Sequence, residues 1–126
     1  HTTVPLNQVS NNVETFKNKF NKGVMILETA YPWTTATDDN YNNLFGSQPP
    51  VDGYPYSPQG QYDLLVQISK EVKDGGGQGL VYWEPAWISS DTKDLWGTGS
   101  AWENSTFFDF DGNTIKGIDF MKYDFN

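Results

Sequence analysis

Residues 24–33 read VMILETAYPW: four apolar residues, the carboxylate of Glu28, and then a turn-like run that contains aromatic residues and a proline. Consecutive apolar positions are typical of a parallel strand that is covered on both faces. We therefore expect a short buried strand over about residues 23–28, with Glu28 at its carboxyl end. A carboxylate in that place is either a catalytic group or an ordinary charge where the strand meets water.

A helix is predicted on either side of this strand. Upstream, apolar residues recur at the helical spacings of four, three and four (Val9, Val13, Phe16, Phe20), with Ser10 or Asn11 as N-cap and a stop at residues 21–23. Downstream, Ser57 as N-cap and Pro58 at the first helical position predict a helix over about residues 58–74.

The stretch GLVYWEP at residues 79–85 predicts a second buried strand over about 79–84, which ends at Glu84. A strand–helix–strand crossover of this length predicts two parallel neighbours joined by a right-handed connection. Two parallel strands are too few for a complete sheet, so we expect a slice of a larger α/β protein whose upstream part precedes His1. Residues 105–126 predict a short hairpin or a last helix, with DFDGN at 109–113 as a turn.

The composition excludes several classes of function. Sixteen acidic residues against eight basic ones give a net charge of −8 and a pI near 4.3, which argues against binding to nucleic acids and to anionic membranes. The chain contains no cysteine, so neither disulfides nor thiol chemistry is expected. No segment approaches the roughly 18 consecutive apolar residues of a membrane span. Five Trp, seven Tyr and eight Phe would suit a sugar-binding cleft.

Glu28 and Glu84 end the two predicted strands in similar sequences, MILETAYPW and VYWEPAW. Ligands of parallel α/β folds bind at the carboxyl ends of the strands, so both carboxylates are expected at one mouth. Trp33, Trp83 and Trp87 surround them in the sequence. This pattern indicates glycoside hydrolysis, in which one carboxylate attacks the sugar and another donates a proton. It is equally compatible with two strand-end charges that accept hydrogen bonds from backbone amides.

Three motifs in order, ETAYPWT (28–34), YWEPAWI (82–88) and GSAWENSTFFDFDGN (99–113), closely resemble the C-terminal part of the endo-β-1,4-galactanases of glycoside hydrolase family 53. The resemblance spans nearly the whole chain and is weakest between residues 34 and 56. It implies an α/β fold, the (β/α)8 TIM barrel. Residues 1–126 would form its C-terminal fragment, with strands 7 and 8, the intervening helices and long loops.

The resemblance also implies roles for the two glutamates. Glu28 matches the catalytic nucleophile, whereas the family's acid/base glutamate lies at the end of the fourth strand and is absent from this chain. Glu84 matches a supporting position that orients Glu28 or bonds to a sugar hydroxyl, and it is not expected to be the proton donor. The isolated chain of 126 residues is therefore expected to be inactive.

The tryptophans divide into two groups. The resemblance implies that Trp83 forms the floor of the subsite where the bond breaks, and packing in the core is the alternative. Trp33 and Trp87 are expected to line the cleft as substrate-binding residues. Trp96 and Trp102 are expected to pack within the loop that carries them.

Asp38, Asn40 and Asn42 offer oxygen ligands at alternate positions, a spacing that lets a tight loop wrap Ca²⁺. The resemblance implies a structural calcium in bacterial members, where it joins the loops after strands seven and eight; Asp94 or Asp91 would be the second anchor. The loop departs from the Asp/Gly/His-rich sequence of that site, and a solvated loop rich in turn formers is the alternative. No other cofactor is expected.

The predicted function is endo-acting hydrolysis of β-1,4-galactan, which forms arabinogalactan side chains of pectin, by a retaining double displacement. The alternatives are a non-catalytic carbohydrate-binding module, or another retaining glycosidase of the same barrel type. Expected partners are galactan polysaccharide or oligosaccharides, together with the remainder of the barrel (strands 1–6) or a second copy of the chain to cover exposed edges. A polymeric substrate implies an extracellular, periplasmic or cell-surface location in a bacterium.

Overall fold

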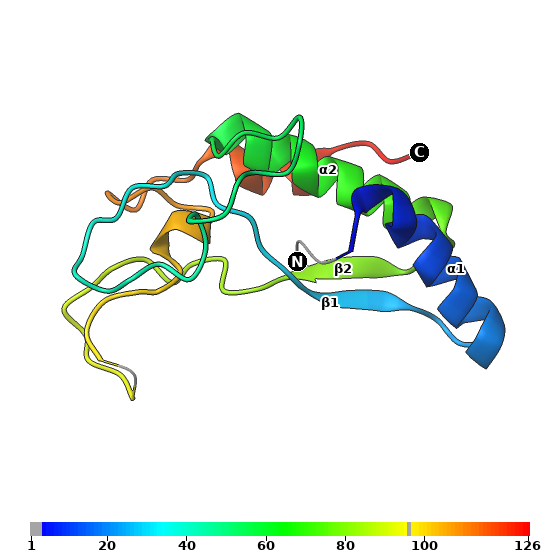
Figure 1. Ribbon diagram of the computed structural model, residues 1–126, viewed down its shortest axis with the longest axis horizontal. Coiled ribbons are helices and arrows are strands. Elements are labelled where there is room, and N and C mark those ends of the chain that lie inside the picture. Colours follow the sequence, from blue (N-terminus) through cyan, green and yellow to red (C-terminus); the bar gives the residue numbers. More distant parts are fainter. Residues whose placement is uncertain (1–3, 96) are drawn as a thin grey trace.

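The computed structural model describes residues 4–95 and 97–126. Within these residues the chain forms two strands, two α-helices and three 3₁₀ helices (Figure 1). Their bounds are Leu6–Gln8 (η1), Val9–Phe20 (α1), Met25–Thr29 (β1), Pro58–Asp74 (α2), Gly79–Tyr82 (β2), Glu103–Ser105 (η2) and Lys116–Lys122 (η3).

The two strands pair in parallel, as the crossover predicted, with Met25 opposite Gly79 and Ile26 opposite Leu80. Figure 1 shows β1 and β2 side by side, the helices on one side of them, and the long loops beyond their carboxyl ends. β2 is shorter than predicted, because the backbone turns into a left-handed conformation at Glu84 (φ 51°). The parallel strands and α-helices do not match the antiparallel sandwich expected of a carbohydrate-binding module.

Helix α1 begins differently from the prediction. Neither Ser10 nor Asn11 is its N-cap: the 3₁₀ turn η1 runs directly into the helix at Val9, and Gln8 precedes it without a side-chain cap bond. This turn already orders the backbone upstream, because the Gln8 amide donates to the Pro5 carbonyl (2.9 Å). The predicted stop is confirmed, since Asn21 adopts the left-handed conformation (φ 49°) that ends many helices.

Helix α2 has the predicted bounds, and local chemistry explains both. The Ser57 hydroxyl accepts a hydrogen bond from the Gly60 amide (2.9 Å), and Pro58 occupies the first helical position, where its missing N–H has no consequence. A Cβ at Gly60 would lie 1.9 Å from the Pro55 carbonyl oxygen, so only glycine allows the preceding loop to approach the helix this closely.

The hydrophobic core lies between α2 and the C-terminal segment. Leu65 and Val66 of α2 pack with Phe107 and with Phe120 of η3, and all four are less than 9% exposed. For the C-terminal segment the sequence predicted a short hairpin or a last helix, and the structure contains part of each. An antiparallel bridge joins Phe108 to Thr114, and the 3₁₀ helix η3 follows it. The turn predicted at residues 109–113 is confirmed, with the Asp109 carboxylate accepting bonds from the amides of residues 111 and 113.

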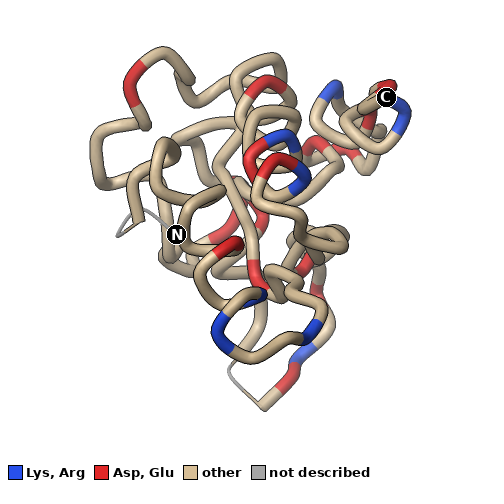
Figure 2. Tube along the Cα trace, turned by 90° about the vertical axis from the view of Figure 1, so that its right-hand side faces the viewer, with Lys and Arg blue, Asp and Glu red and all other residues tan. Residues whose placement is uncertain are grey.

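Acidic residues are distributed over the whole trace, whereas the lysines lie in a few separate groups (Figure 2). This arrangement agrees with the net charge of −8. Among the described helices, none combines the length and the apolarity that crossing a membrane would need.

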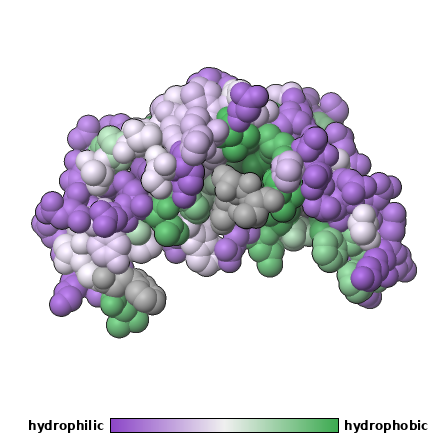
Figure 3. All heavy atoms as spheres, viewed as in Figure 1, coloured by the Kyte–Doolittle hydropathy of each residue, from purple (hydrophilic) through white to green (hydrophobic). Residues whose placement is uncertain are grey.

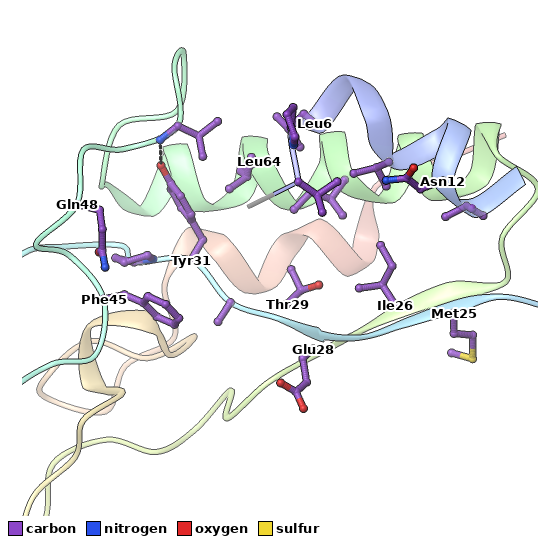
Figure 4. Close-up of a pocket in the computed structure, with 18 of the residues that line it drawn as sticks. Leu6, Asn12, Met25, Ile26, Glu28, Thr29, Tyr31, Phe45, Gln48 and Leu64 are labelled. Carbon is purple, nitrogen blue, oxygen red and sulfur yellow. Dashed lines mark hydrogen bonds between the residues drawn. The ribbon is translucent and has the colours of Figure 1, made fainter. Parts of the chain in front are cut away.

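The sheet face opposite the helices is open, which corrects the prediction of two buried strands. Met25, Leu27, Val81 and Trp83 are 47%, 66%, 43% and 42% exposed. A two-stranded sheet with all its helices on one side cannot bury both of its faces. Figure 3 shows apolar residues gathered in the middle of the molecule between two polar ends. An apolar hollow of about 500 Å³ also opens between α1, β1 and α2 (Figure 4).

Candidate functional site

Glu28 lies near the carboxyl end of β1, on the open face of the sheet. In Figure 4 its side chain points away from α2, on the same side as Met25, whereas Ile26 and Thr29 point toward the helices. Glu28 is exposed, and no hydrogen bond or ion pair joins its carboxylate to the described residues. The carboxylate is therefore accessible from the open face and available to a ligand.

A β-bulge explains why Glu28 points to this face. Ile26 pairs with Leu80 and Thr29 pairs with Tyr82, so Leu27 and Glu28 together lie opposite the single residue Val81. In a regular strand alternate side chains point to opposite faces, so Glu28 would share the helix side with Ile26. The extra residue changes this alternation, as bulges near active sites commonly do. Sequence reasoning placed Glu28 at the strand end but did not predict the bulge.

The end of β2 lies directly beside Glu28, as the sequence predicted. The Trp83 amide donates to the Thr29 carbonyl (2.9 Å), which continues the contact between the strands by one residue. Trp83 is 42% exposed and Glu84 is half-buried. The structure thus brings Glu28, Trp83 and Glu84 together at one edge of the sheet.

Trp33 and Trp87 lie in the two loops beyond this edge, and both are half-buried. The Trp33 indole N–H donates to the Glu103 carbonyl (3.2 Å), and its ring packs against Phe110 with 5.0 Å between centroids. The Trp87 carbonyl accepts a hydrogen bond from the Ser100 hydroxyl (2.5 Å). Trp33 is thus anchored to the loop that follows β2, and Trp87 is held within that loop.

Trp102 is buried, as predicted, but its ring packs against the loop after β1 as well as against its own loop. It is 7% exposed, its ring packs edge-on against Phe45 with 5.1 Å between centroids, and its indole N–H donates to the Trp83 carbonyl (3.0 Å). The prediction for Trp96 lies outside the described residues.

A buried carboxylate that sequence reasoning missed joins the two loops. Glu103 is 1% exposed; its Oε1 accepts bonds from the Asp38 amide (2.9 Å) and the Asn43 side-chain amide (3.4 Å). The Ser89 hydroxyl contacts Glu103 Oε2 and donates to Asp39 Oδ2 (2.6 Å). We call these five residues the loop clamp: Asp38, Asp39, Asn43, Ser89 and Glu103. The indication available in the sequence was that Glu103 follows small and apolar residues in the stretch SAWEN at residues 100–104.

The second carboxylate of the loop clamp is held in its charged form by donors. Burial raises the pKa of Asp39, but hydrogen bonds from the Ser89 hydroxyl and from the amides of Ser100 and Tyr41 outweigh that effect and lower the pKa below its ordinary value. Because its partners come from the loop after β2 as well as from its own loop, Asp39 reinforces the connection made by Glu103.

The calcium hypothesis stays a prediction. Asp38, Asn40 and Asn42 are exposed, and the Asp94 carboxylate accepts a bond from the Gly97 amide in its own turn (3.0 Å). Among the described residues, no group of three or more His, Cys, Asp or Glu side chains is placed to hold a metal ion. The loop clamp joins the same two loops through direct hydrogen bonds.

A buried polar network fixes the backbone just after Glu28. The Tyr82 hydroxyl accepts from the Tyr31 amide (3.0 Å) and donates to the Ser105 carbonyl (2.6 Å). The Gln61 side-chain amide donates to the Tyr31 carbonyl (2.8 Å) and to the Thr106 carbonyl (3.1 Å). Strand β2, helix α2 and the C-terminal segment thus all contact the chain that leaves β1.

These tyrosines predict loss of stability in alkali. Burial raises the pKa of Tyr31 to about 12 and raises that of Tyr82 as well, whereas an unfolded tyrosine titrates at about 10. Their contribution is fully present below pH of about 10 and is lost as the pH rises toward the folded values, because only the unfolded state releases the protons. We therefore expect alkaline unfolding to begin as the pH rises above about 10. Circular dichroism and tyrosinate absorbance would follow it. A Tyr82→Phe variant should lose less stability between neutral and alkaline pH; an equal loss would contradict the assignment.

The family model of glycosyl hydrolase family 53 matches residues 1–121. An arabinogalactan endo-β-1,4-galactanase of Cellvibrio japonicus is 41% identical over 122 residues, which cover 95% of this chain and 32% of that protein. An endo-β-1,4-galactanase of Bacillus subtilis is 29% identical, over 84% of this chain and 32% of that protein. The chain spans about a third of the length of these curated relatives.

The comparison of structures leads to the same family as the comparison of sequences. The structure of the Ignisphaera aggregans GH53 catalytic domain superposes with a TM-score of 0.81 at 30% identity, over 93% of this chain and 34% of that domain. The α/β arrangement described above is therefore that of one part of a larger catalytic domain.

Proposed function

Because this chain belongs to glycosyl hydrolase family 53, we propose that it is the C-terminal part of an endo-acting β-1,4-galactanase, called the parent enzyme below. Strands β1 and β2 would be strands 7 and 8 of its (β/α)8 barrel. The observation that carries the proposal is the exposed Glu28 carboxylate, on the open sheet face beside Trp83 and at the carboxyl end of a parallel strand. Active sites of such barrels lie at that end.

Glu28 would be the nucleophile of a retaining double displacement. Its carboxylate attacks the anomeric carbon, a C–O ester bond forms, and the glycosidic bond breaks as a second carboxylic acid protonates the leaving oxygen. Water, deprotonated by the same second group, then releases the sugar and frees Glu28. The two carboxyl groups of a retaining enzyme lie about 5–5.5 Å apart. We assign the second group to the part of the parent enzyme outside these 126 residues.

The aromatic side chains would hold the galactan chain. Trp83 offers an exposed ring beside Glu28, on which the apolar face of a sugar can stack. Trp33 and Trp87, half-buried in the adjoining loops, would extend this surface along the polymer. Galactan is a polymer found outside cells, so the parent enzyme would act outside the bacterial cytoplasm, secreted, periplasmic or on the cell surface.

The open face would be covered by the rest of the barrel. Met25 and Leu27, on this face, are 47% and 66% exposed. A preceding strand and its neighbours would occupy this side in the parent enzyme, whereas a second copy of the chain would cover it in the isolated fragment.

The proposal predicts different activities for the parent enzyme and for the isolated chain of 126 residues. The parent enzyme should hydrolyse β-1,4-galactan with a rapid fall in viscosity, as an endo-acting enzyme does, and its first product should keep the β-configuration by NMR. The isolated chain of 126 residues should show no hydrolysis, because it carries one of the two catalytic carboxylates. Measurable hydrolysis by the isolated chain would contradict the assignment of the acid/base to another part of the enzyme. A parent enzyme that acts on another β-glycan instead would favour the alternative of a different barrel glycosidase.

A further inference from the structure

The direction of the Glu28 carboxylate depends on the register of β1 just after its bulge. Thr29 is paired with Tyr82, and Figure 4 shows Ile26 and Thr29 pointing toward the helices while Glu28 points away from them. A shift of the pairing by one residue turns a side chain to the other face of a sheet. Whatever holds Thr29 opposite Tyr82 therefore also holds Glu28 on the open face.

Tyr82 holds this register with its side chain as well as with its backbone. Its hydroxyl accepts a hydrogen bond from the Tyr31 amide (3.0 Å), two residues beyond Thr29, and donates to the Ser105 carbonyl (2.6 Å). Its ring packs against Phe107 with 4.2 Å between centroids. A shift of one residue moves a strand by about 3.3 Å and would separate the Tyr31 amide from the hydroxyl. The side chain thus fixes the chain on the far side of the bulge.

Gln61, near the start of α2, holds the same residue by its carbonyl. Its side-chain NH₂ donates to the carbonyls of Tyr31 (2.8 Å) and Thr106 (3.1 Å), and it lies 3.2 Å from the Tyr82 hydroxyl. Backbone carbonyls only accept hydrogen bonds, so this end of the side chain must be the NH₂ group. The amide and the carbonyl of Tyr31 are therefore both held by side chains from other elements.

The orientation of Gln61 leaves its own oxygen without a donor. Gln61 is 0% exposed, and its Oε1 has no hydrogen-bond partner among the described residues. This oxygen faces Gly117 of η3, where a Cβ would lie 1.7 Å from it, so only glycine allows the approach. A buried acceptor without a donor costs stability. The amide is thus kept here for what its NH₂ group holds.

We propose that Tyr82 and Gln61 are positioning residues for the nucleophile: by holding both polar groups of the Tyr31 backbone, they keep the bulge in place and direct Glu28 to the open face. Neither side chain bonds to the Glu28 carboxylate, so both act through the backbone. The inference rests on the proposed function, because it takes Glu28 as the nucleophile. It predicts slower bond making with unchanged substrate binding, since Trp83 stays exposed on the open face.

The test uses Tyr82→Phe and Gln61→Met variants of the parent enzyme. Phenylalanine keeps the ring without the hydroxyl, and methionine keeps an unbranched side chain without the donors. In each variant kcat on galactan should fall by about tenfold to a hundredfold, the scale of a displaced reacting group. KM should stay within about twofold. The thermal midpoint should fall by about 2–4 °C. If one variant does not fold, the other decides.

A 2,4-dinitrophenyl 2-deoxy-2-fluoro-β-galactobioside makes the test specific for the nucleophile. Glu28 attacks the anomeric carbon, an ester bond forms, and dinitrophenolate leaves with the electron pair of the broken bond and needs no proton. The fluorine slows hydrolysis of the ester, so mass spectrometry should find the label on Glu28. The rate constant of labelling should fall by about tenfold to a hundredfold in both variants.

Ser57→Ala is the matched control for lost stability. Its hydroxyl caps the same helix through the Gly60 amide and does not contact the chain that leaves β1. Its removal should lower the thermal midpoint by about 2–4 °C and leave kcat and the labelling rate unchanged. The double variant of Tyr82 and Gln61 should lose less kcat than the product of the two single losses, because both act on Tyr31.

The outcomes distinguish this inference from the proposed function. Unchanged kcat and labelling in a folded variant of an active enzyme would overturn the inference alone, as would a loss confined to KM. An equal fall of kcat in Ser57→Ala would also overturn it, since lost stability would then explain the effect. A fall of kcat with unchanged labelling would assign the defect to the acid and overturn it too. A wild-type parent enzyme that is neither labelled at Glu28 nor active on galactan would overturn the proposed function, and this inference with it.

Discussion

Replacing Glu28 with alanine in the parent enzyme is expected to lower kcat on β-1,4-galactan by about four or more orders of magnitude, the scale of a missing nucleophile. The acid, the aromatic surface and the loop clamp all remain, but no group is left to form the covalent intermediate. Substrate binding should change little, because the carboxylate acts in bond making. Initial rates of reducing-end release from galactan measure the effect directly.

Chemical rescue makes this test specific. Azide is small enough to occupy the space of the missing carboxylate, and it should attack the anomeric carbon as the acid protonates the leaving oxygen. The product should be an α-configured galactosyl azide, which NMR identifies. Glu14→Ala is the matched control, because Glu14 is an exposed glutamate on α1 away from the sheet edge. Near-normal activity of the Glu28→Ala enzyme would show that Glu28 is an ordinary strand-end charge.

The second large effect is expected at Glu103, the buried member of the loop clamp. In a Glu103→Ala variant the Asp38 amide and the Asn43 side-chain amide lose a buried acceptor, and the Ser89 hydroxyl, which donates to Asp39, loses its contact with Glu103 Oε2. Each such loss costs about 1–3 kcal/mol, so the free energy of unfolding of the parent enzyme should fall by roughly 3 kcal/mol or more. Denaturant titration measures this change. KM should rise as well, because the Glu103 backbone also holds the Trp33 ring.

Glu103→Gln separates the hydrogen bonds from the charge. Glutamine keeps the length of the side chain, its carbonyl can accept from the Asp38 amide, and its NH₂ can donate to the Ser89 oxygen. The loss should then be within about 1 kcal/mol, the scale of one exchanged hydrogen bond. Asp111→Ala, an exposed acidic residue in the C-terminal turn, should be close to neutral. Equal losses for glutamine and alanine at position 103 would contradict the hydrogen-bond explanation.

Local signals predicted the helices and the sheet edge well. Ser57 and Pro58 act on the first turn of the helix they precede, so the start of α2 could be read from adjacent residues. Parallel pairing followed from the length of the crossover, and the meeting of Glu28 with Trp83 followed from the pairing. The apolar runs predicted two buried strands, whereas the open face follows from the separate expectation that the chain is a slice of a larger sheet.

Long-range packing accounts for what could not be predicted at the site. The Asp38 amide and the Glu103 carboxylate are 65 positions apart, and neither loop carries a pattern that indicates the other. Ser10 and Asn11 were wrong as caps because the turn η1 extends the ordered backbone by three residues upstream. The left-handed conformation of Glu84 could not be predicted either, because it depends on hydrogen bonds with three other segments.

The bulge in β1 matters for anyone who transplants this catalytic strand into a designed barrel. Idealised scaffolds are built from regular strands. Copying residues 25–29 onto such a strand would keep the sequence but would change the face of the sheet to which some side chains point. Glu28 would then point at the helical layer and be buried as an unpaired acid, and Thr29 would take its place in the open. Grafting should therefore copy the backbone irregularity together with the amino acids.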